Sequence, residues 1–420
     1  MSQILPGTLN GTPWRKNLSV IFTTELIFLL AFSAVIPFMP LFIQDLGTPT
    51  IGRPFTNEEA ASWAGIASAV GSAAMFLSAP IWGMIADRWG RKNMLLRAMI
   101  GNAVVTALMG LSPNIYIFVL LRFIQGLLSG TITAASSLVA ATTPRERVPA
   151  SLGLLMVAMY VGNSVGLVVG GYFPGWMGSY QTPFYIVAAI LALMSVIVLV
   201  MVQEKFQPPE RGHAPSFTSI AKLASSRQVL PILAASCLLY IATNMSGPVI
   251  TLFFKQLGEG MPDFKPSEYA GFAFFFISVF ASISSIVAGK MSKRFSLITI
   301  LIWSSLGTAL LTLPAALSQN VMQLLIFVSL SGLLQGALIT GSSSVLGTTI
   351  PISQQGMAFG LNQSASSLGN GIGALIGGWL GAMIGLNFPF YIAAVFFVFT
   401  GLMYVVALKM ANKPLTPQSR

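Results

Sequence analysis

Long apolar stretches alternate with short polar segments along the whole chain. Each stretch has about 20 residues or more, the length that an α-helix needs to cross the hydrocarbon core of a bilayer. The apolar residues run continuously, whereas a membrane β-barrel requires apolar and polar residues to alternate. The pattern therefore predicts twelve transmembrane helices, at residues 18–42, 62–86, 94–112, 115–140, 150–174, 183–203, 229–254, 269–291, 297–315, 320–342, 356–384 and 388–409.

The composition agrees with a surface that faces lipid. Of the 420 residues, 55% are hydrophobic and only 8% are charged, against about 25% charged in an ordinary soluble domain. The first apolar stretch is long and lacks the small-residue cleavage site of a signal peptide, so we expect it to remain as helix 1.

The net charge of +11 is unevenly distributed. Eighteen of the 22 Lys and Arg residues fall in the segments that lie on one side of the predicted bundle, together with both termini. Cytoplasmic segments of membrane proteins carry this excess of basic residues. The charge therefore predicts a multi-pass protein of the plasma (inner) membrane with both termini in the cytoplasm, and it gives no reason to expect a nucleic-acid partner.

The two halves of the chain resemble each other at offsets of 206–211 residues. Three pairs of segments match in register: 37–47 with 248–258, 153–171 with 360–378, and 183–189 with 389–395. Six helices per half give both halves the same orientation, and a substrate site is then expected near the midplane between them. The predicted organisation is an N-terminal six-helix bundle (1–203), a cytoplasmic linker (204–228) and a C-terminal six-helix bundle (229–420).

The segment GMIADRWGRK (83–92) resembles the signature loop between helices 2 and 3 of the major facilitator superfamily. With twelve helices and a six-plus-six repeat, the resemblance covers essentially the whole chain. It implies an all-α membrane protein made of two parallel-repeat six-helix bundles that rock to carry a substrate. It also implies a cytoplasmic gate loop formed by Gly83, Asp87, Arg88, Gly90, Arg91 and Lys92.

A glycine motif in the fifth helix resembles that of proton-coupled drug exporters of the same superfamily. Gly153, Gly162, Gly166, Gly170 and Gly171 fit the motif, but Leu167 stands where it has proline. Glycines spaced by four residues clear one helix face for close packing, and we interpret them as a contact between helices 5 and 11. The missing proline leaves a second reading open, a carrier or symporter for a specific small metabolite.

Glu25 is the only acidic residue inside a predicted helix, and Arg122 is the only basic one deep in the membrane. The segment around Arg122, VLLRFIQG (119–126), resembles the arginine-containing segment of proton-coupled members. Counted at 1.5 Å per residue, Glu25 lies about 10 Å in from the cytoplasmic surface of the membrane, and Arg122 lies about 10 Å in from the outer surface. Across a core of about 30 Å this separates them by roughly 10 Å of depth, so a direct ion pair is not expected.

The position of Glu25, twelve residues before Pro37, resembles that of the substrate-sensing acid of polyspecific drug exporters. A carboxyl group in a dry cavity holds its proton, and a wet cavity releases it. We therefore interpret Glu25 and Arg122 as the residues that couple proton movement to substrate binding. The expected function is proton-coupled efflux of amphipathic, often cationic drugs or toxic compounds.

The remaining cavity is expected to be apolar with scattered hydrogen-bonding groups, which suits small lipophilic or cationic substrates. Its candidate residues are Ser33, Gln125, Asn244, Asn362, Gln363 and Phe275. The single cysteine and single histidine offer no metal set, and no nucleophile–base pair indicates an enzyme. We expect a monomer that needs no cofactor beyond a proton gradient.

Overall fold

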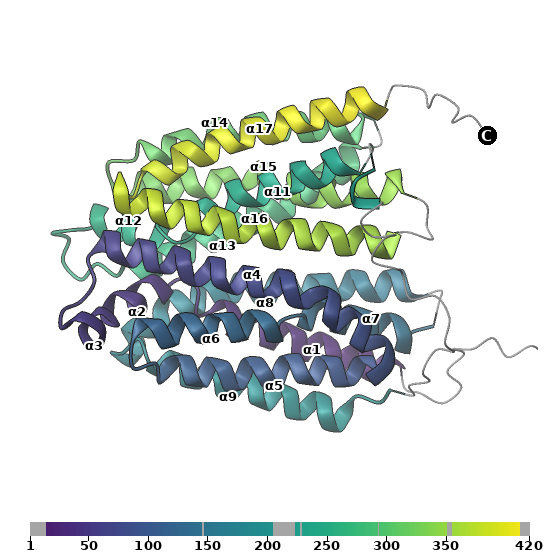
Figure 1. Cartoon of the computed structure of the whole chain (residues 1–420), viewed down its shortest axis with the longest axis horizontal. Coiled ribbons are helices and arrows are strands. Elements are labelled where there is room, and N and C mark those ends of the chain that lie inside the picture. Colours follow the sequence, from purple (N-terminus) through teal and green to yellow (C-terminus); the bar gives the residue numbers. More distant parts are fainter. Residues whose placement is uncertain are drawn as a thin grey trace, which may run out of the picture.

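The chain folds into two side-by-side groups of long helices (Figure 1). The computed structural model describes residues 14–144, 147–204, 223–226, 229–292, 294–350 and 355–411, and these contain no strand. In Figure 1 the purple-to-blue N-terminal half lies below the green-to-yellow C-terminal half.

The helices of the N-terminal half are α1 (Trp14–Ser33), α2 (Met39–Asp45), α3 (Gly47–Ile51), α4 (Asn57–Trp89), α5 (Arg91–Gly110), α6 (Ile115–Leu128), α7 (Thr131–Thr142), α8 (Val148–Met177) and α9 (Thr182–Met201). Those of the C-terminal half are α11 (Leu230–Met245), α12 (Ile250–Leu257), α13 (Pro266–Met291), α14 (Leu297–Ala316), α15 (Val321–Thr349), α16 (Gln355–Met383) and α17 (Phe388–Ala411).

Every predicted apolar stretch coincides with one of these helices or with a consecutive pair. Within the described residues, 11 segments are long and apolar enough to cross a membrane. The remaining stretch, 356–384, forms α16, whose 29 residues are long enough but rich in Gly, Ser and Asn. Its low hydropathy follows from close helix packing, because glycine is the residue that lets backbones approach.

The first helix of each half is interrupted in the same place. The backbone leaves the helix between α1 and α2, around Pro37, and again between α11 and α12, around Pro248. Proline cannot donate the hydrogen bond that would continue a helix. At membrane depth, irregular backbone is tolerated only where protein or a cavity surrounds it.

The fourth membrane crossing is also broken, at Ser129 and Gly130, where Gly130 has φ +113°. Two side chains satisfy the carbonyl groups freed there: Trp82 donates to the Leu127 carbonyl at 2.6 Å and Arg97 to the Ser129 carbonyl at 3.0 Å. The Arg97 guanidinium also lies 3.5 Å from the centroid of the Trp82 ring. The matching helix of the other half, α15, runs without a break.

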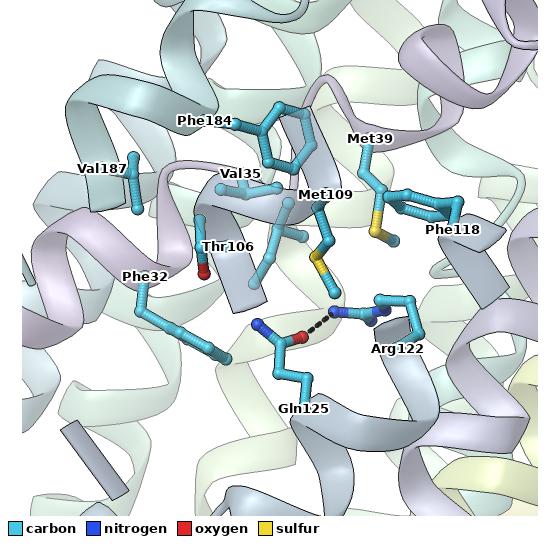
Figure 2. Close-up of a pocket in the computed structure, with 11 residues that line it drawn as sticks. Phe32, Val35, Met39, Thr106, Met109, Phe118, Arg122, Gln125, Phe184 and Val187 are labelled. Atoms are coloured by element: carbon cyan, nitrogen blue, oxygen red, sulfur yellow. Dashed lines mark hydrogen bonds between the residues drawn. The ribbon is translucent and has the colours of Figure 1, made fainter. Parts of the chain in front are cut away.

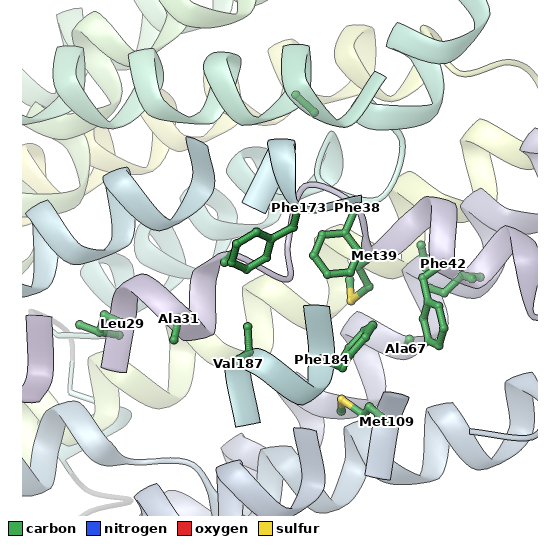
Figure 3. Close-up of a cluster of buried hydrophobic side chains, with 14 of the residues drawn as sticks. Leu29, Ala31, Phe38, Met39, Phe42, Ala67, Met109, Phe173, Phe184 and Val187 are labelled. Carbon is green, nitrogen blue, oxygen red and sulfur yellow. The ribbon is translucent and has the colours of Figure 1, made fainter. Parts of the chain in front are cut away.

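An aromatic cluster anchors the short helix α2 inside the N-terminal half (Figure 3). The Phe42 ring lies 4.8 Å from that of Phe184 in α9 and 5.6 Å from that of Phe118 in α6. All three side chains are almost completely buried. The cluster fixes the position of the chain just beyond the break at Pro37.

The two halves meet through α4 against α16 and through α8 against α13. The basic end of the bundle is the end with the α4–α5 and α13–α14 loops, where Arg91 begins α5 and Arg294 lies before α14. The other end carries the loops that follow α3, α5 and α12, and we call it the opposite end.

Candidate functional site

Each half contains a cavity beside the break in its first helix. The N-terminal cavity has a volume of about 140 Å³ and lies between α1, α5, α6 and α9 (Figure 2). Its walls are mostly apolar and include Phe32, Met39, Met109, Phe118 and Phe184. The C-terminal cavity, of about 180 Å³, lies between α11, α13, α14, α15 and α17.

Arg122 and Gln125 supply the strongest polar groups of the N-terminal cavity. Both lie on α6, three residues apart and therefore on one helix face. The Arg122 guanidinium donates to Gln125 Oε1 at 2.7 Å (Figure 2). Arg122 Nε is buried and has no hydrogen-bond partner within the described residues. The cavity thus contains a cation that is only partly satisfied.

Glu25 lies on α1 and is completely buried. Neither of its carboxylate oxygens has a hydrogen-bond partner in the part of the chain that the structure describes. No ion pair joins it to Arg122, in agreement with the depth count. An ionised carboxylate without a partner costs several kcal/mol in a dry interior, so this conformation favours a neutral, protonated Glu25.

The glycine motif does not pack helix 5 against helix 11, contrary to our interpretation. A Cβ at Gly162, Gly166 or Gly170 of α8 would overlap, respectively, the carbonyl oxygens of Leu26 and Leu30 on α1 and of Ala34, the residue that follows α1. In the second half, Gly369, Gly373 and Gly377 of α16 face α11 in the same way. Glycines four residues apart thus bind the first and fifth helices of one half together.

The second glycine of each Gly-Gly pair faces the other half instead. A Cβ at Gly171 would lie 2.6 Å from the Ser267 carbonyl oxygen of α13, and one at Gly378 would lie 2.5 Å from the Ala61 carbonyl oxygen of α4. The adjacent glycines point elsewhere because successive helix residues are turned by about 100°. The glycine motif therefore forms two interfaces, one with the first helix of its own half and one with a helix of the other half.

Hydrogen bonds between the halves gather at the opposite end. The Thr251 hydroxyl donates to the Pro37 carbonyl at 3.0 Å, and the Ser267 hydroxyl donates to the Gly171 carbonyl at 2.7 Å. Lys255 donates to Gln44, which in turn donates to Asn57 at 3.0 Å. Within the described ranges, no hydrogen bond between the halves lies nearer the basic end.

Two charged groups accompany these contacts at the opposite end. Burial raises the pKa of Asp45, and the neighbouring charge of Lys255 counteracts this rise.

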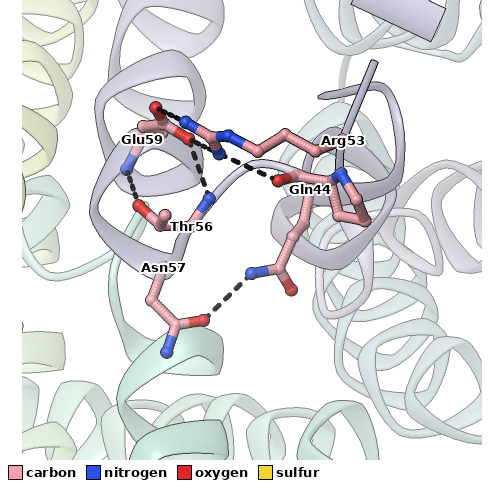
Figure 4. A network of polar contacts seen from close by, with 6 residues as sticks. Gln44, Arg53, Thr56, Asn57 and Glu59 are labelled. Carbon is pink, nitrogen blue, oxygen red and sulfur yellow. Dashed lines mark hydrogen bonds and ion pairs between the residues drawn. The ribbon is translucent and has the colours of Figure 1, made fainter. Parts of the chain in front are cut away.

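A network on the surface of the opposite end fixes the start of α4. Arg53 binds both carboxylate oxygens of Glu59 at 2.8 Å, and Glu59 accepts from the Thr56 backbone N–H at 2.9 Å (Figure 4). Glu59, in the first turn of α4, is therefore bound to two residues that precede the helix, Arg53 and Thr56.

The halves separate toward the basic end, as the glycines show. Gly153 lies 18 residues before Gly171, five helical turns, and so on the same face of α8. A Cβ at Gly153 would meet nothing within 4 Å. The equivalent residue of α16, Gly360, is also open, although Gly378 on the same face is tightly packed. Among the described residues, the halves are thus in contact at the opposite end and apart at Gly153 and Gly360, toward the basic end.

The signature loop is organised by Glu204, an acid of the predicted linker 204–228. Gly90 has φ +87°, which favours glycine, and precedes the first residue of α5. Glu204 accepts from the backbone N–H groups of Arg91 at 3.1 Å and Lys92 at 2.9 Å. Lys92 also donates to the Leu199 carbonyl at 2.7 Å. The side chains of Asp87 and Arg88, and the surroundings of Gly83, lie outside the description.

The other candidate residues occupy different environments. Ser33 donates to the Leu29 carbonyl and to the Asn163 carbonyl of α8, so it joins two helices. Asn244 lines the C-terminal cavity and pairs with Asn370. Asn362 is buried on α16, and its Oδ1 has no partner among the described residues. Gln363 is exposed, and Phe275 stacks edge-on with Phe276.

The fold, with two halves of six membrane crossings and an equivalent cavity in each half, is that of a multi-span membrane transporter. The family model of the Major Facilitator Superfamily matches residues 21–313 and 233–420. The chain therefore belongs to this superfamily, whose members are transporters and not enzymes, and the predicted all-α fold class is confirmed.

Curated relatives cover nearly the whole chain. One is the "Multidrug resistance protein MdtG" of Enterobacter lignolyticus (strain SCF1), 31% identical over 407 residues, 96% of this chain and 95% of the relative. The protein of the same name from Klebsiella pneumoniae (strain 342) is 30% identical and covers 94% of both chains.

Solved structures share the fold at low identity. A bacterial homolog of the human lysosomal transporter Spinster, in an inward-facing and occupied conformation, gives a TM-score of 0.74 at 15% identity, covering 97% of this chain and 100% of that one. The human organic anion transporter MFSD10 gives 0.68 at 17%, covering 94% and 100%.

Proposed function

We propose that this protein exports amphipathic, often cationic compounds in exchange for protons. The observation that carries the proposal is Glu25, a carboxyl group sealed inside the N-terminal half without a partner among the described residues. Acids in membrane helices are costly and mark proton or substrate pathways. The relatives at about 31% identity, named multidrug resistance proteins, support export of many compounds.

The orientation follows from the charges. The basic end is cytoplasmic, in keeping with the excess of Lys and Arg on that side. The protein then lies in the plasma (inner) membrane with both termini inside, and it works as a monomer. The open basic end makes this conformation inward-facing, with the path to the outside closed by the contacts around Thr251 and Lys255.

The proposed cycle uses the two buried ionisable residues at different depths. While it is buried inside the N-terminal half, Glu25 holds a proton. When water enters from the cytoplasmic side the carboxyl group ionises, and a cationic substrate replaces the proton. Arg122, in the neighbouring cavity, disfavours a second cation and so limits the exchange to one positive species at a time.

The test is transport of a cationic dye by the full chain in proteoliposomes, with and without an imposed pH gradient. Wild-type protein should move the dye only with the gradient. Glu25→Gln, which removes the titratable group at constant size, should reduce gradient-driven transport to that of empty vesicles. Glu58→Gln, at an exposed carboxylate of α4, is the matched control.

Full gradient-driven transport by Glu25→Gln would contradict the proposed coupling. A protein that moves a polar metabolite but no lipophilic dye would instead be the specific carrier that the missing helix-5 proline leaves open.

A further inference from the structure

The two cavities occupy equivalent places in the two repeats. Lining residues of the C-terminal cavity follow those of the N-terminal one by 206 to 211 positions: Thr312 follows Thr106, Ala315 follows Met109, Gln335 follows Gln125 and Phe390 follows Phe184. Each cavity is bordered by the break in the first helix of its half. Val35 and Ile36 line the N-terminal cavity there, and Ser246 and Gly247 line the C-terminal one. The equivalence shows that each is a feature of the fold.

The cavities differ in charge and in size. Arg122 lines the N-terminal cavity, whereas its counterpart Gly332 has no side chain and faces the backbone of Ile277. Met109 is likewise replaced by the smaller Ala315. The C-terminal cavity is therefore the larger of the two, at about 180 Å³ against 140 Å³, and no charged residue lines it.

The hydroxyl groups of the C-terminal cavity are arranged to accept hydrogen bonds. Thr243 donates its proton to the Leu239 carbonyl at 2.9 Å, Thr312 donates to Thr308 at 2.8 Å and Ser331 donates to Val328 at 2.7 Å. Each proton is thus used within its own helix. The oxygens of Thr243 and Thr312 accept no hydrogen bond from the described residues, whereas the Ser331 oxygen already accepts one from Gln335 at 2.9 Å. A hydroxyl oxygen has two acceptor sites, so these groups suit a ligand that donates.

The apolar walls and the volume define the rest of the ligand. Phe274, Phe390, Phe397 and Ile277 surround the hydroxyl groups. An engineered apolar cavity of about 150 Å³ holds one benzene molecule, so about 180 Å³ has room for a single substituted ring. A charged group would find no counter-ion among the lining residues and would pay for its desolvation.

We propose that the C-terminal cavity is a binding subsite for a neutral aromatic ring that carries a hydrogen-bond donor. As the second of two repeat-related cavities, it would receive the uncharged aromatic part of an exported compound, and in this role it rests on the proposed function. Arg122 would keep a cationic part out of the N-terminal cavity, and that part would pair with Glu25 as in the proposed function, so the two halves would divide the recognition of one molecule.

The experiment uses the full-length protein in nanodiscs and 4-fluorophenol, a neutral donor, followed by ¹⁹F NMR with empty nanodiscs as the reference. Saturable binding is expected for 4-fluorophenol, weaker binding for fluorobenzene, which lacks the donor, and none for 4-fluorobenzoate, which is charged. Fluorobenzene binding as tightly as 4-fluorophenol would overturn the donor requirement.

Two variants locate the site. Thr312→Val keeps the shape but removes an acceptor, and we expect it to weaken 4-fluorophenol binding about fivefold, the effect of one neutral hydrogen bond. Ala315→Met copies the N-terminal residue into the C-terminal cavity, fills it and should abolish binding. Thr106→Val, the equivalent change in the N-terminal cavity, is the matched control and should leave the affinity unchanged.

Wild-type affinity in both Thr312→Val and Ala315→Met, or loss in Thr106→Val alone, would overturn the assignment. Glu25→Gln separates this proposal from the proposed function, because binding without a pH gradient does not need proton exchange. Phenol binding without any dye transport would overturn the exporter and retain the subsite, and dye transport without phenol binding would do the reverse.

Discussion

At the scale of single residues, the polar groups buried in this bundle differ in how well they are satisfied. Arg97 and Trp82 complete the backbone at the break in the fourth crossing, and Arg122 has Gln125. Glu25 is the only buried carboxylate among the described residues, and neither of its oxygens has a partner. Arg97 and Arg122 each make one hydrogen bond and leave other nitrogens unpaired. Glu25 differs from them in having no side-chain hydrogen bond, which suits it to a change of protonation.

Glu204 is a residue whose role can be tested locally. Glu204→Gln should weaken the two bonds to the N-terminus of α5 by about 0.3–1 kcal/mol, because a carboxylate interacts favourably with the positive end of a helix. Hydrogen–deuterium exchange of the amides of Arg91 and Lys92 should then become faster.

The control for this change is Gln203→Ala, since Gln203 uses only its backbone groups, in bonds to Asn17. Unchanged exchange at Arg91 in Glu204→Gln would mean that water replaces the carboxylate without loss.

At the scale of helices, the glycine motif works by position. Glycines that face the first helix of the half permit contact between backbones, whereas Gly153 and Gly360 face open space. The same residue type, within one motif, therefore has opposite structural consequences.

Alanine at Gly170 and at Gly153 should change stability in opposite directions. Gly170→Ala places a methyl group against the Ala34 carbonyl and should destabilise by about 1–3 kcal/mol. Gly153→Ala has free space and should stabilise by about 0.5–1 kcal/mol, because alanine favours a helix over glycine.

Thermal unfolding of the purified variants measures both effects. Gly377→Ala and Gly360→Ala repeat the comparison in the second half. A similar shift for both members of either pair would contradict the packing described.

Much of the element scale was predictable from the sequence, and the exceptions have physical causes. Apolar length located every crossing, and the Gly-Gly pairs marked tight packing, but a glycine pattern does not name the helix it faces. The breaks at Pro37 and Pro248 lie within apolar stretches, so the hydropathy of the sequence does not reveal them. The role of Glu204 is not predictable from the sequence, because its partners are the backbone N–H groups of Arg91 and Lys92, which no sequence pattern displays.

At the scale of the whole molecule, the sequence predicted two related halves, and the structure adds which ends touch. The paired cavities and the opening toward the basic end depend on three-dimensional contacts between distant segments. No sequence pattern distinguishes Thr106 and Thr312, whereas the fold places them at equivalent positions in the two cavities.

Closure at the opposite end can be tested by cross-linking. In a background with the lone Cys237 replaced by Ser, Gln44→Cys with Lys255→Cys should react with a short, reducible thiol cross-linker, because these residues are in contact. The linked protein should stop transporting, and reduction should restore transport, since alternating access requires the halves to part there.

The control pair is Gly153→Cys with Gly360→Cys, on the open faces of α8 and α16. It should resist the same cross-linker, because Gly153 and Gly360 lie on the faces that meet α13 and α4 respectively nearer the opposite end, and not against each other. Continued transport by fully linked Gln44→Cys/Lys255→Cys would show that this contact is not part of the gate.

The contact between Gln44 and Lys255 has a further consequence, because these residues hold the same position in the two repeats, 211 residues apart. In a dimer of two identical halves, a residue on the twofold axis faces its own copy. A lysine there would face a lysine, and two like charges repel. A hydrogen-bonded pair of unlike residues at this point requires the two halves to have diverged in sequence after duplication. The contact between Gln44 and Lys255 is thus one that an ancestor with two identical halves could not form.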